Sequence, residues 1–414
     1  MTQAAAAADA AELVAWTVEV GDLGELLSWL PAGQAFAFLR GGDGIVGWGE
    51  AARLDLDQGA DPAAEVGSLL AAMTVRDDVG LPGCGAVAIA SLGFDPAQDA
   101  SVVVVPKVLL GRREGRSWLT LVNPPGAVEV PALLRRPVAA ASAPPAAVSA
   151  LVPSEAEWSD AVATAVRSLR AGELDKVVLA RAIEVTAQYG LDPRAVSARL
   201  ALRFPACFTY LCDGLVGASP ELLIRRLGRH AESLVLAGTV RRGNSPDEDA
   251  ELERSLLDSA KDAAEHRMAA ESVRDVLTAV ASDVVCDQRP QLLRLANLSH
   301  LATHVEAWLP DPAPSALALA ALLHPSAAVG GTPRAEALAM ISRLEAAPRG
   351  RYAAPVGWID ANGDGEFAIA LRCAQLTGNI ARLWAGAGIV ADSDPACEVA
   401  ETSVKFDAVL SALV

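Results

Sequence analysis

Long apolar runs, basic clusters and paired cysteines are all missing from this sequence of 414 residues. No uninterrupted apolar run approaches the ~18 residues of a membrane span. The stretch Met1–Ala11 has no basic residue before its alanines. We therefore expect no membrane segment and no secretion signal, and we expect the protein to be cytoplasmic.

The charge balance excludes two further classes of partner. The 34 Lys and Arg residues and the 51 Asp and Glu residues give a formal net charge of −17. No Lys/Arg run interleaved with aromatic residues is present, so a phosphate backbone would have to bind against the overall field of the protein. We therefore expect neither nucleic acid nor an anionic membrane surface as a partner.

The six cysteines are scattered along the chain and form no CxxC pair. This pattern argues against a disulfide framework and against a structural zinc site. We expect reduced, mostly buried thiols at Cys84, Cys207, Cys212, Cys286, Cys373 and Cys397.

Lysine is scarce although arginine is not, because only four of the 34 basic residues are lysine. A lysine ammonium is compact and can lose its proton when it is desolvated, which the guanidinium of arginine does not do in proteins. Each lysine is therefore a candidate for a special role, although compositional bias and chance explain the same count. The four are Lys107, Lys176, Lys261 and Lys405.

What is present indicates a large globular protein, since 52% of the residues are apolar and the mean hydropathy is +0.30. The length suits two domains or one composite fold. An Ala/Pro-rich stretch between residues 124 and 153 separates residues 1–145, read as sheet and scaffold, from residues 154–414. All five histidines lie beyond residue 229. We predict that residues 154–414 carry the chemistry and that the whole chain forms one composite domain.

The predicted elements mix strands and helices without regular βαβ alternation. Ser154 and Glu157 form a capping-box pattern before a helix that stops at Gly172. Apolar periodicity predicts strands over 175–185, 208–211, 222–224 and 292–308, and helices over 249–281, 335–344 and 395–413. This order predicts an α+β fold, with large antiparallel sheets forming a central core and helices packed outside.

Two of these helices place carboxylates where they could hold a metal. The helix 395–413 has Glu398, Glu401 and Lys405 at i, i+3 and i+7, and the helix 249–281 has Asp262 and Glu265 on one face, next to His266. Carboxylates from two helices around one point suit Mg²⁺, which takes oxygen ligands and keeps waters. The alternative is that both are solvated helix faces with ordinary ion pairs.

A possible acid–base pair comes from two strand segments. Lys176 lies beside apolar strand residues, and Glu221 stands where a tight turn enters an apolar strand. If they face each other across a pocket, one could remove a proton and the other could donate one. An edge-strand lysine with a solvated head and a solvated strand entry are the ordinary alternatives. The glycines from Gly386 onward would let backbone N–H groups approach a bound anion.

Taken together, these stretches resemble one family, the chorismate-utilising enzymes, over roughly residues 154–414. Eight matching segments occur in family order, whereas residues 1–145 match no motif. The segments are 174–181 (LDKVVLAR), 217–223 (GASPELL), 237–243 (AGTVRRG), 259–266 (SAKDAAEH), 300–303 (HLAT), 324–334 (HPSAAVGGTPR), 352–374 and 385–405.

The resemblance implies the chorismate-utilising enzyme fold and a role for each matching residue. Lys176 looks like the general base that activates a water, and Glu221 looks like the general acid that protonates the departing C4 hydroxyl. Glu265 and Glu401 look like direct Mg²⁺ ligands, supported by Asp262 and Glu398. The residues that resemble contacts to chorismate are Tyr352, Arg372, Gly386 and Lys405, with Gly238, Thr239 and His300 lining the same pocket.

The reaction implied by the resemblance is that of isochorismate synthase, an isomerase of menaquinone or siderophore biosynthesis. Ala237 stands where aminodeoxychorismate synthases typically carry a nucleophilic lysine, and Lys176 stands where anthranilate-type members typically carry glutamine. Salicylate synthase, which goes on to eliminate pyruvate, is the nearest alternative, and a binding protein that keeps the pocket without turnover is a further one. We expect a monomer that binds chorismate and needs no glutamine amidotransferase subunit.

Overall fold

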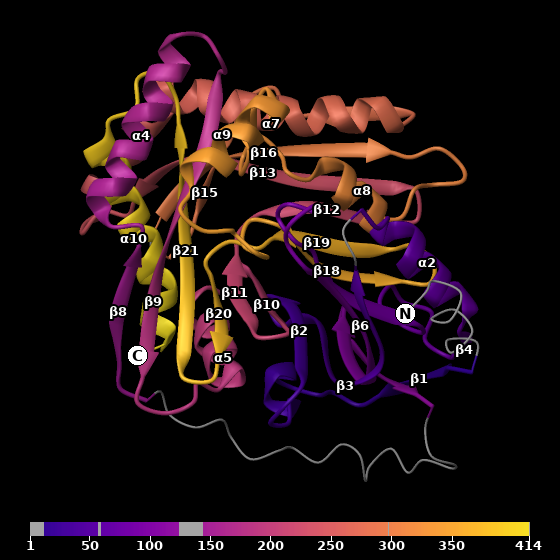
Figure 1. Cartoon of the computed structure of the whole chain (residues 1–414). Helices are drawn as coiled ribbons and strands as arrows, with labels where there is room; N and C mark the ends of the chain where they lie inside the picture. The colour runs from indigo at the N-terminus through magenta and orange to yellow at the C-terminus, as the bar shows by residue number, and fades with distance from the viewer. Residues whose placement is uncertain (1–11, 57–58, 124–143, 297, 414) are drawn as a thin grey trace.

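The computed structural model describes residues 12–56, 59–123, 144–296 and 298–413 (Figure 1). The stretch Met1–Ala11 and most of the predicted Ala/Pro-rich junction lie outside the described residues.

The described residues form 21 strands that hydrogen-bond into one continuous sheet. Every pairing is antiparallel except that of β1 with β4, which confirms the predicted α+β class with large antiparallel sheets. The strands are β1 Val14–Val20, β2 Ala35–Arg40, β3 Asp43–Leu56, β4 Thr74–Asp77, β5 Val87–Ser91, β6 Ser101–Arg113, β7 Arg116–Val122, β8 Ala146–Val152, β9 Lys176–Ala187, β10 Phe208–Cys212, β11 Leu215–Ser219, β12 Leu222–Leu227, β13 His230–Arg241, β14 Asp283–Cys286, β15 Gln291–Arg294, β16 Leu298–Trp308, β17 Gly331–Thr332, β18 Pro355–Asp360, β19 Gly365–Ile369, β20 Cys373–Thr377 and β21 Ile380–Ile389.

The sheet has two arms that meet at β6. One arm runs from β8 through β9, β21, β20, β11, β10 and β2 to β3, and the other runs from β5 through β18, β19, β12 and β13 to β16. In Figure 1 the strands β8, β9 and β21 stand upright, whereas β12, β13, β16, β18 and β19 run across them. Strands from the first 123 residues thus join strands from the second half in both arms, because β2 pairs with β10 and β5 pairs with β18.

Helices pack on the outer faces of this sheet, as predicted (Figure 1). A capping box starts α4, since the Ser154 side chain accepts from the Glu157 N–H and the Glu157 carboxylate accepts from the Ser154 N–H. The helices are α2 Pro62–Ala72, α4 Glu155–Arg170, α5 Pro193–Arg203, α6 Pro246–Asp258, α7 Ala260–Val280, α8 Ala316–Leu323, α9 Arg334–Leu344 and α10 Pro395–Leu413.

The single helix predicted over 249–281 is wrong, because the chain breaks at Ser259 into α6 and α7. Ser259 has an extended backbone (φ −73°, ψ 113°), and its hydroxyl accepts a hydrogen bond from the Asp262 N–H at 3.1 Å. The apolar periodicity continues across the break, so it did not reveal the cap. As a result, Asp262 and Glu265 lie at the start of a helix rather than in its middle.

The single strand predicted over 292–308 is also wrong, because this segment is a hairpin of β15 and β16. Gln291 pairs with Ala302, and Arg294 pairs with Ser299. The first half likewise contains a helix that the sequence reading did not include, α2, which starts with Asp61 accepting from two backbone N–H groups.

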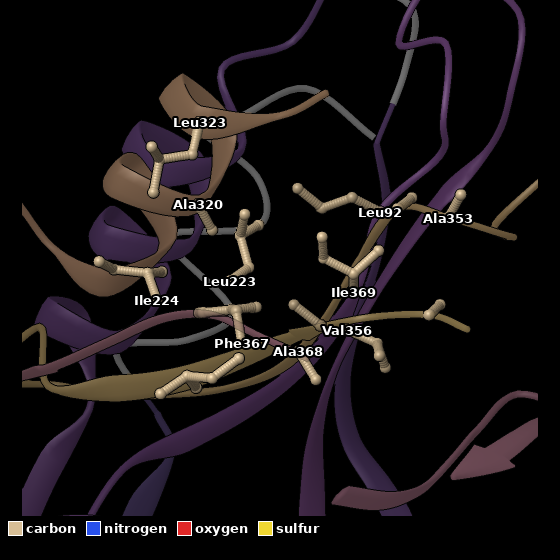
Figure 2. Packing of buried hydrophobic residues seen from close by; sticks show 14 of the residues in the cluster. Leu92, Leu223, Ile224, Ala320, Leu323, Ala353, Val356, Phe367, Ala368 and Ile369 are labelled. Carbon is tan, nitrogen blue, oxygen red and sulfur yellow. The ribbon is translucent and has the colours of Figure 1, made fainter. Parts of the chain in front are cut away.

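The apolar core fills the space between the strands and the outer helices. Figure 2 shows one part of it, where Ala320 and Leu323 of α8 lie over Ile224 of β12 and Phe367 of β19. Four of the six cysteines are buried and all six are free, in agreement with the expected reduced thiols. None of the described helices combines the length and the apolar character needed to cross a membrane.

Candidate active site

One cavity at the junction of β9 and β21 with β13 and β16 collects the predicted site residues. All of them line it except Lys176 and Glu398, which are buried beside it. The lining residues among those predicted are Glu221, Gly238, Thr239, Asp262, Glu265, His300, Tyr352, Arg372, Gly386, Glu401 and Lys405. Segments separated by more than 200 residues in sequence therefore meet at one place.

Lys176 is the first residue of β9 and is completely buried. Its Nζ lies 3.1 Å from Oε1 of Glu265, but the angle is not that of a hydrogen bond, so the ammonium has no hydrogen-bond partner among the described residues. Burying an ammonium is costly for stability unless it is paired, and the Glu265 carboxylate is the ion-pair partner of Lys176 here. The ordinary alternative for Lys176, an edge-strand lysine with its head in water, does not fit this environment.

Glu221 lies in the turn between β11 and β12 and is 4% exposed. Burial raises the pKa of its carboxyl to about 8, although the Leu236 N–H and the charges of Lys176 and Lys405 lower it in part. At neutral pH this group is therefore mostly protonated and can donate a proton.

The two glutamates of α10 each accept a hydrogen bond from a lysine. Glu398 accepts from Lys261 Nζ at 2.8 Å, and Glu401 accepts from Lys405 Nζ at 2.6 Å. Burial would raise the pKa of Glu401, but the charge and hydrogen bond of Lys405 hold it below its ordinary value. The excess negative charge expected for a carboxylate cluster is thus balanced within the site.

The predicted metal ligands surround the same cavity, but they do not converge as the side chains lie here. In the described part of the chain, no three His, Cys, Asp or Glu side chains come close enough to hold one metal ion. The donor set itself suits Mg²⁺, since Asp262, Glu265 and Glu401 offer hard carboxylate oxygens from two helices to one cavity. Coordination would require Glu265 and Glu401 to turn from Lys176 and Lys405, and all three carboxylates to face a common point.

The cavity lining also presents donors for an anion. Arg372 is in the left-handed region (φ 49°), and its guanidinium lies 3.5 Å from Nε2 of His300. Burial and the charges of Arg372 and Lys405 hold the pKa of His300 well below its ordinary value, so the imidazole is neutral. His300 Nδ1 and the Thr239 hydroxyl share a hydrogen bond of 2.9 Å. The lining therefore carries guanidinium and ammonium charge rather than imidazolium charge.

His266, considered alongside the α7 carboxylates, has a structural role instead. Its Nδ1–H donates to the Ala237 carbonyl at 3.1 Å, and its Nε2 pairs with the Thr303 hydroxyl at 2.7 Å. These bonds join α7 to β13 and β16. The histidine therefore holds the helix that presents Asp262 and Glu265 to the cavity.

Sequence reasoning missed two charged residues of the cavity wall, Lys261 and Arg349. Lysine scarcity was the available signal for Lys261, because three of the four lysines now lie at this site and only Lys107 is elsewhere. Arg349 is one of 30 arginines, so its residue type gave no such signal.

The family model described as "Chorismate binding enzyme" matches residues 3–414. The chain belongs to this family. The match begins at residue 3 and so covers most of the first 145 residues as well, where the sequence alone showed no motif.

Curated members of the family include isochorismate synthases. The chain is 39% identical over 267 residues to isochorismate synthase EntC of Escherichia coli, covering 63% of this chain and 68% of that protein. It is 42% identical over 261 residues to the salicylate biosynthesis isochorismate synthase of Pseudomonas aeruginosa, covering 62% and 54%. The solved structure of MenF, the menaquinone-specific isochorismate synthase of E. coli, superposes with a TM-score of 0.81 at 25% identity over 97% of this chain and 95% of that one.

Proposed function

We propose that this chain is an isochorismate synthase, a Mg²⁺-dependent isomerase that adds water at C2 of chorismate and expels the C4 hydroxyl with migration of the double bond. One observation carries the proposal: a fully buried lysine, ion-paired with Glu265, lies beside the cavity whose lining includes a buried glutamic acid with a raised pKa. The names of the curated relatives support the same activity.

The two groups divide the proton transfers between them. Lys176 accepts a proton from the water whose oxygen bonds to C2, and Glu221 gives its proton to the C4 hydroxyl, which leaves as water. Both groups are buried, so bulk water competes little for either proton. Because one water enters and one leaves, the substrate and product are isomers.

Chorismate is a dianion, and the protein as a whole carries a charge of −17. Binding therefore depends on local cations and donors, for which we propose Arg372, Lys405, Tyr352 and the backbone of Gly386. Lys405 Nζ donates to the Gly386 carbonyl at 2.8 Å, which ties α10 to β21 at this wall. Gly238, Thr239 and neutral His300 line the remainder of the pocket.

We propose that Glu265 and Glu401 are the direct Mg²⁺ ligands, with Asp262 and Glu398 in support. When bound, the ion supplies positive charge that offsets these carboxylates and a carboxylate of the substrate. The chain's contribution is the placement of four acidic side chains on α7 and α10.

We further propose that the enzyme is cytoplasmic and works as a monomer. It needs no amidotransferase subunit, since water replaces ammonia as the nucleophile.

A product assay tests this function. The purified protein with chorismate and Mg²⁺ at neutral pH is expected to give a reversible chorismate–isochorismate mixture with little pyruvate. The HLAT sequence at His300 resembles isochorismate-forming members, and elimination would need a different alignment of the enolpyruvyl group. Pyruvate released as fast as chorismate disappears, with salicylate fluorescence rising in step, would assign the chain to the salicylate synthases. If chorismate were not consumed, the protein would instead be a binding protein that keeps the pocket without turnover.

A further inference from the structure

The strand that carries Lys176 has a gap in its pairing. On one side β9 pairs with β21 from Val177 onward. On the other side β17 pairs with Lys176 and Val177, and β8 pairs with β9 only from Ala182. No described strand covers residues 178–181 on that side. Unpaired backbone groups at such a buried edge are costly unless other groups replace the strand.

Two side chains fill part of this gap. The Glu345 carboxylate accepts from the Ala180 N–H at 2.8 Å, and Arg349 Nη2 donates to the Val178 carbonyl at 2.7 Å. Glu345 and Arg349 also bond to each other, with 2.9 Å between Nε and Oε2. A carboxylate and a guanidinium thus provide the acceptor and the donor that a neighbouring strand would have supplied.

The pair is buried, and each nitrogen of the guanidinium donates at least one hydrogen bond. The side chains of Arg349 and Glu345 are 2% and 7% exposed. Arg349 Nη1 donates to the Val329 carbonyl at 2.8 Å, and its guanidinium lies 4.1 Å from the ring centroid of Phe94. The Phe94 N–H in turn donates to the Gly350 carbonyl at 2.8 Å. A residue from the first 123 therefore supports the pair.

We propose that the Glu345–Arg349 pair is a positioning clamp that holds Lys176 in place through the backbone of β9. Side chains alternate along a strand, so Lys176, Val178 and Ala180 share one face, and Val178 lines the cavity. The backbone at Val178 and Ala180 is what the clamp holds. The inference rests on the proposed function only in naming Lys176 as the base.

Glu345→Gln is the test variant, because Gln has the same shape and Glu345 does not line the cavity. Oε1 of Glu345 accepts from both Ala180 and Arg349, and Oε2 accepts a further bond from Arg349. An amide has one acceptor oxygen and no charge, so glutamine loses the second acceptor and sets a donor NH₂ against the guanidinium. Glu366→Gln is the matched control. Glu366 lies on β19, is also buried and accepts a hydrogen bond from an arginine, Arg113, at 2.7 Å. If Glu345→Gln does not fold, Arg349→Lys, which keeps the charge but loses the planar fork of donors, takes its place.

Three measurements decide the matter. In Glu345→Gln we expect faster hydrogen exchange in the peptide that spans 177–181, and severalfold faster acylation of Lys176 relative to Lys107 in the same sample. We expect kcat to fall about 10- to 100-fold with KM nearly unchanged, because a small displacement of a catalytic group lowers turnover by this order. The control should show none of these changes.

Equal effects in the test variant and the control, or a stability loss without faster Lys176 acylation, would reduce the pair to an ordinary structural ion pair and overturn the proposal. Exchange and acylation do not require turnover. A wild-type protein that leaves chorismate unchanged would therefore refute the proposed function, while these two measurements would still decide the clamp.

Discussion

At the scale of single residues, the site depends on burying two titratable groups with different neighbours. Lys176 lies beside the Glu265 carboxylate, whereas Glu221 has one backbone N–H, that of Leu236, at the limit of hydrogen-bond distance. Burial without a close cation favours the neutral acid at Glu221. The same residue type is therefore an acid at one position of the cavity and a candidate metal ligand at another.

Substitution of either proton-transfer group should stop the reaction. We expect Lys176→Gln and Glu221→Gln to lower kcat by at least about 100-fold, since neither amide can exchange the required proton. Chorismate should still bind to both, because its proposed contacts lie elsewhere. Calorimetric titration with chorismate and a turnover assay would check this, and near-wild-type hydration by Lys176→Gln would show that another group is the base.

Glu221→Gln should also make the protein more stable at high pH. The folded-state pKa of about 8 lies above the ordinary 4.5, so the protonated form contributes fully below pH 4.5, and this contribution is lost as pH rises to about 8. A neutral amide avoids that loss, which amounts to roughly 2 to 5 kcal/mol at pH 8. Urea unfolding of both proteins at pH 4.5 and pH 8 should show a gain only at pH 8, and the same gain at both values would contradict the raised pKa.

At the scale of elements, the site is an intersection of β21, α7 and α10. Glu265 of α7 reaches the cavity across Gly388 of β21, where an added Cβ would lie 2.1 Å from the Glu265 Oε1 and 3.2 Å from the Lys176 Cε. Only glycine allows this approach. The glycine-rich run thus makes room for a carboxylate of the protein as well as for a ligand.

Gly388→Ala should therefore displace Glu265 and impair Mg²⁺ binding. We expect about a 10-fold or greater loss of Mg²⁺ affinity by calorimetry, with a parallel loss of turnover. Gly190→Ala is a suitable control, because the nearest atom to its added Cβ is 3.9 Å away. Wild-type Mg²⁺ affinity in Gly388→Ala would mean that Glu265 is not a ligand.

The carboxylates of α7 and α10 should also make turnover depend steeply on the Mg²⁺ concentration. EDTA is expected to abolish activity and added Mg²⁺ to restore it, because the substrate adds two negative charges beside the acidic side chains. Glu265→Gln or Glu401→Gln should lose Mg²⁺-dependent activity while circular dichroism stays that of the wild type. Full activity in either variant would refute the proposed ligand pair.

At the scale of the whole molecule, the two halves of the sequence are interleaved. The pairings of β2 with β10 and of β5 with β18 place strands of the first half inside the sheet of the second. These strands are almost entirely buried. The interpretation of the chain as one composite domain stays a prediction, and these pairings favour it.

Separated halves should consequently fail to fold alone. A fragment that begins at Ala146 would expose the edges of β10 and β18 together with apolar surface that β2 and β5 cover. We expect it to be aggregated or to lack sharp NMR signals, and co-expression with residues 1–145 to rescue it. A soluble, cooperatively unfolding fragment that converts chorismate would instead establish an independent catalytic domain.

The sequence by itself determined the parts of this protein that depend on local pattern and residue chemistry. Periodicity and capping gave α4 and α10, and motif order gave the family and the set of candidate residues. Scarcity of lysine marked all four lysines as candidates, and three of them lie at this site. The sequence pattern could not separate α6 from α7 or β15 from β16. A break needs only one capping residue or a short turn, and the apolar pattern continues across it.

Only the tertiary structure decided what surrounds each group. Burial raises the pKa of Glu221, and the approach of the Glu265 side chain to β21 leaves no room for a Cβ at Gly388. The Glu345–Arg349 pair bonds the backbone of β9 in the gap between β17 and β8, two strands that are far apart in sequence. Such properties arise from distances between remote segments, which no local pattern encodes.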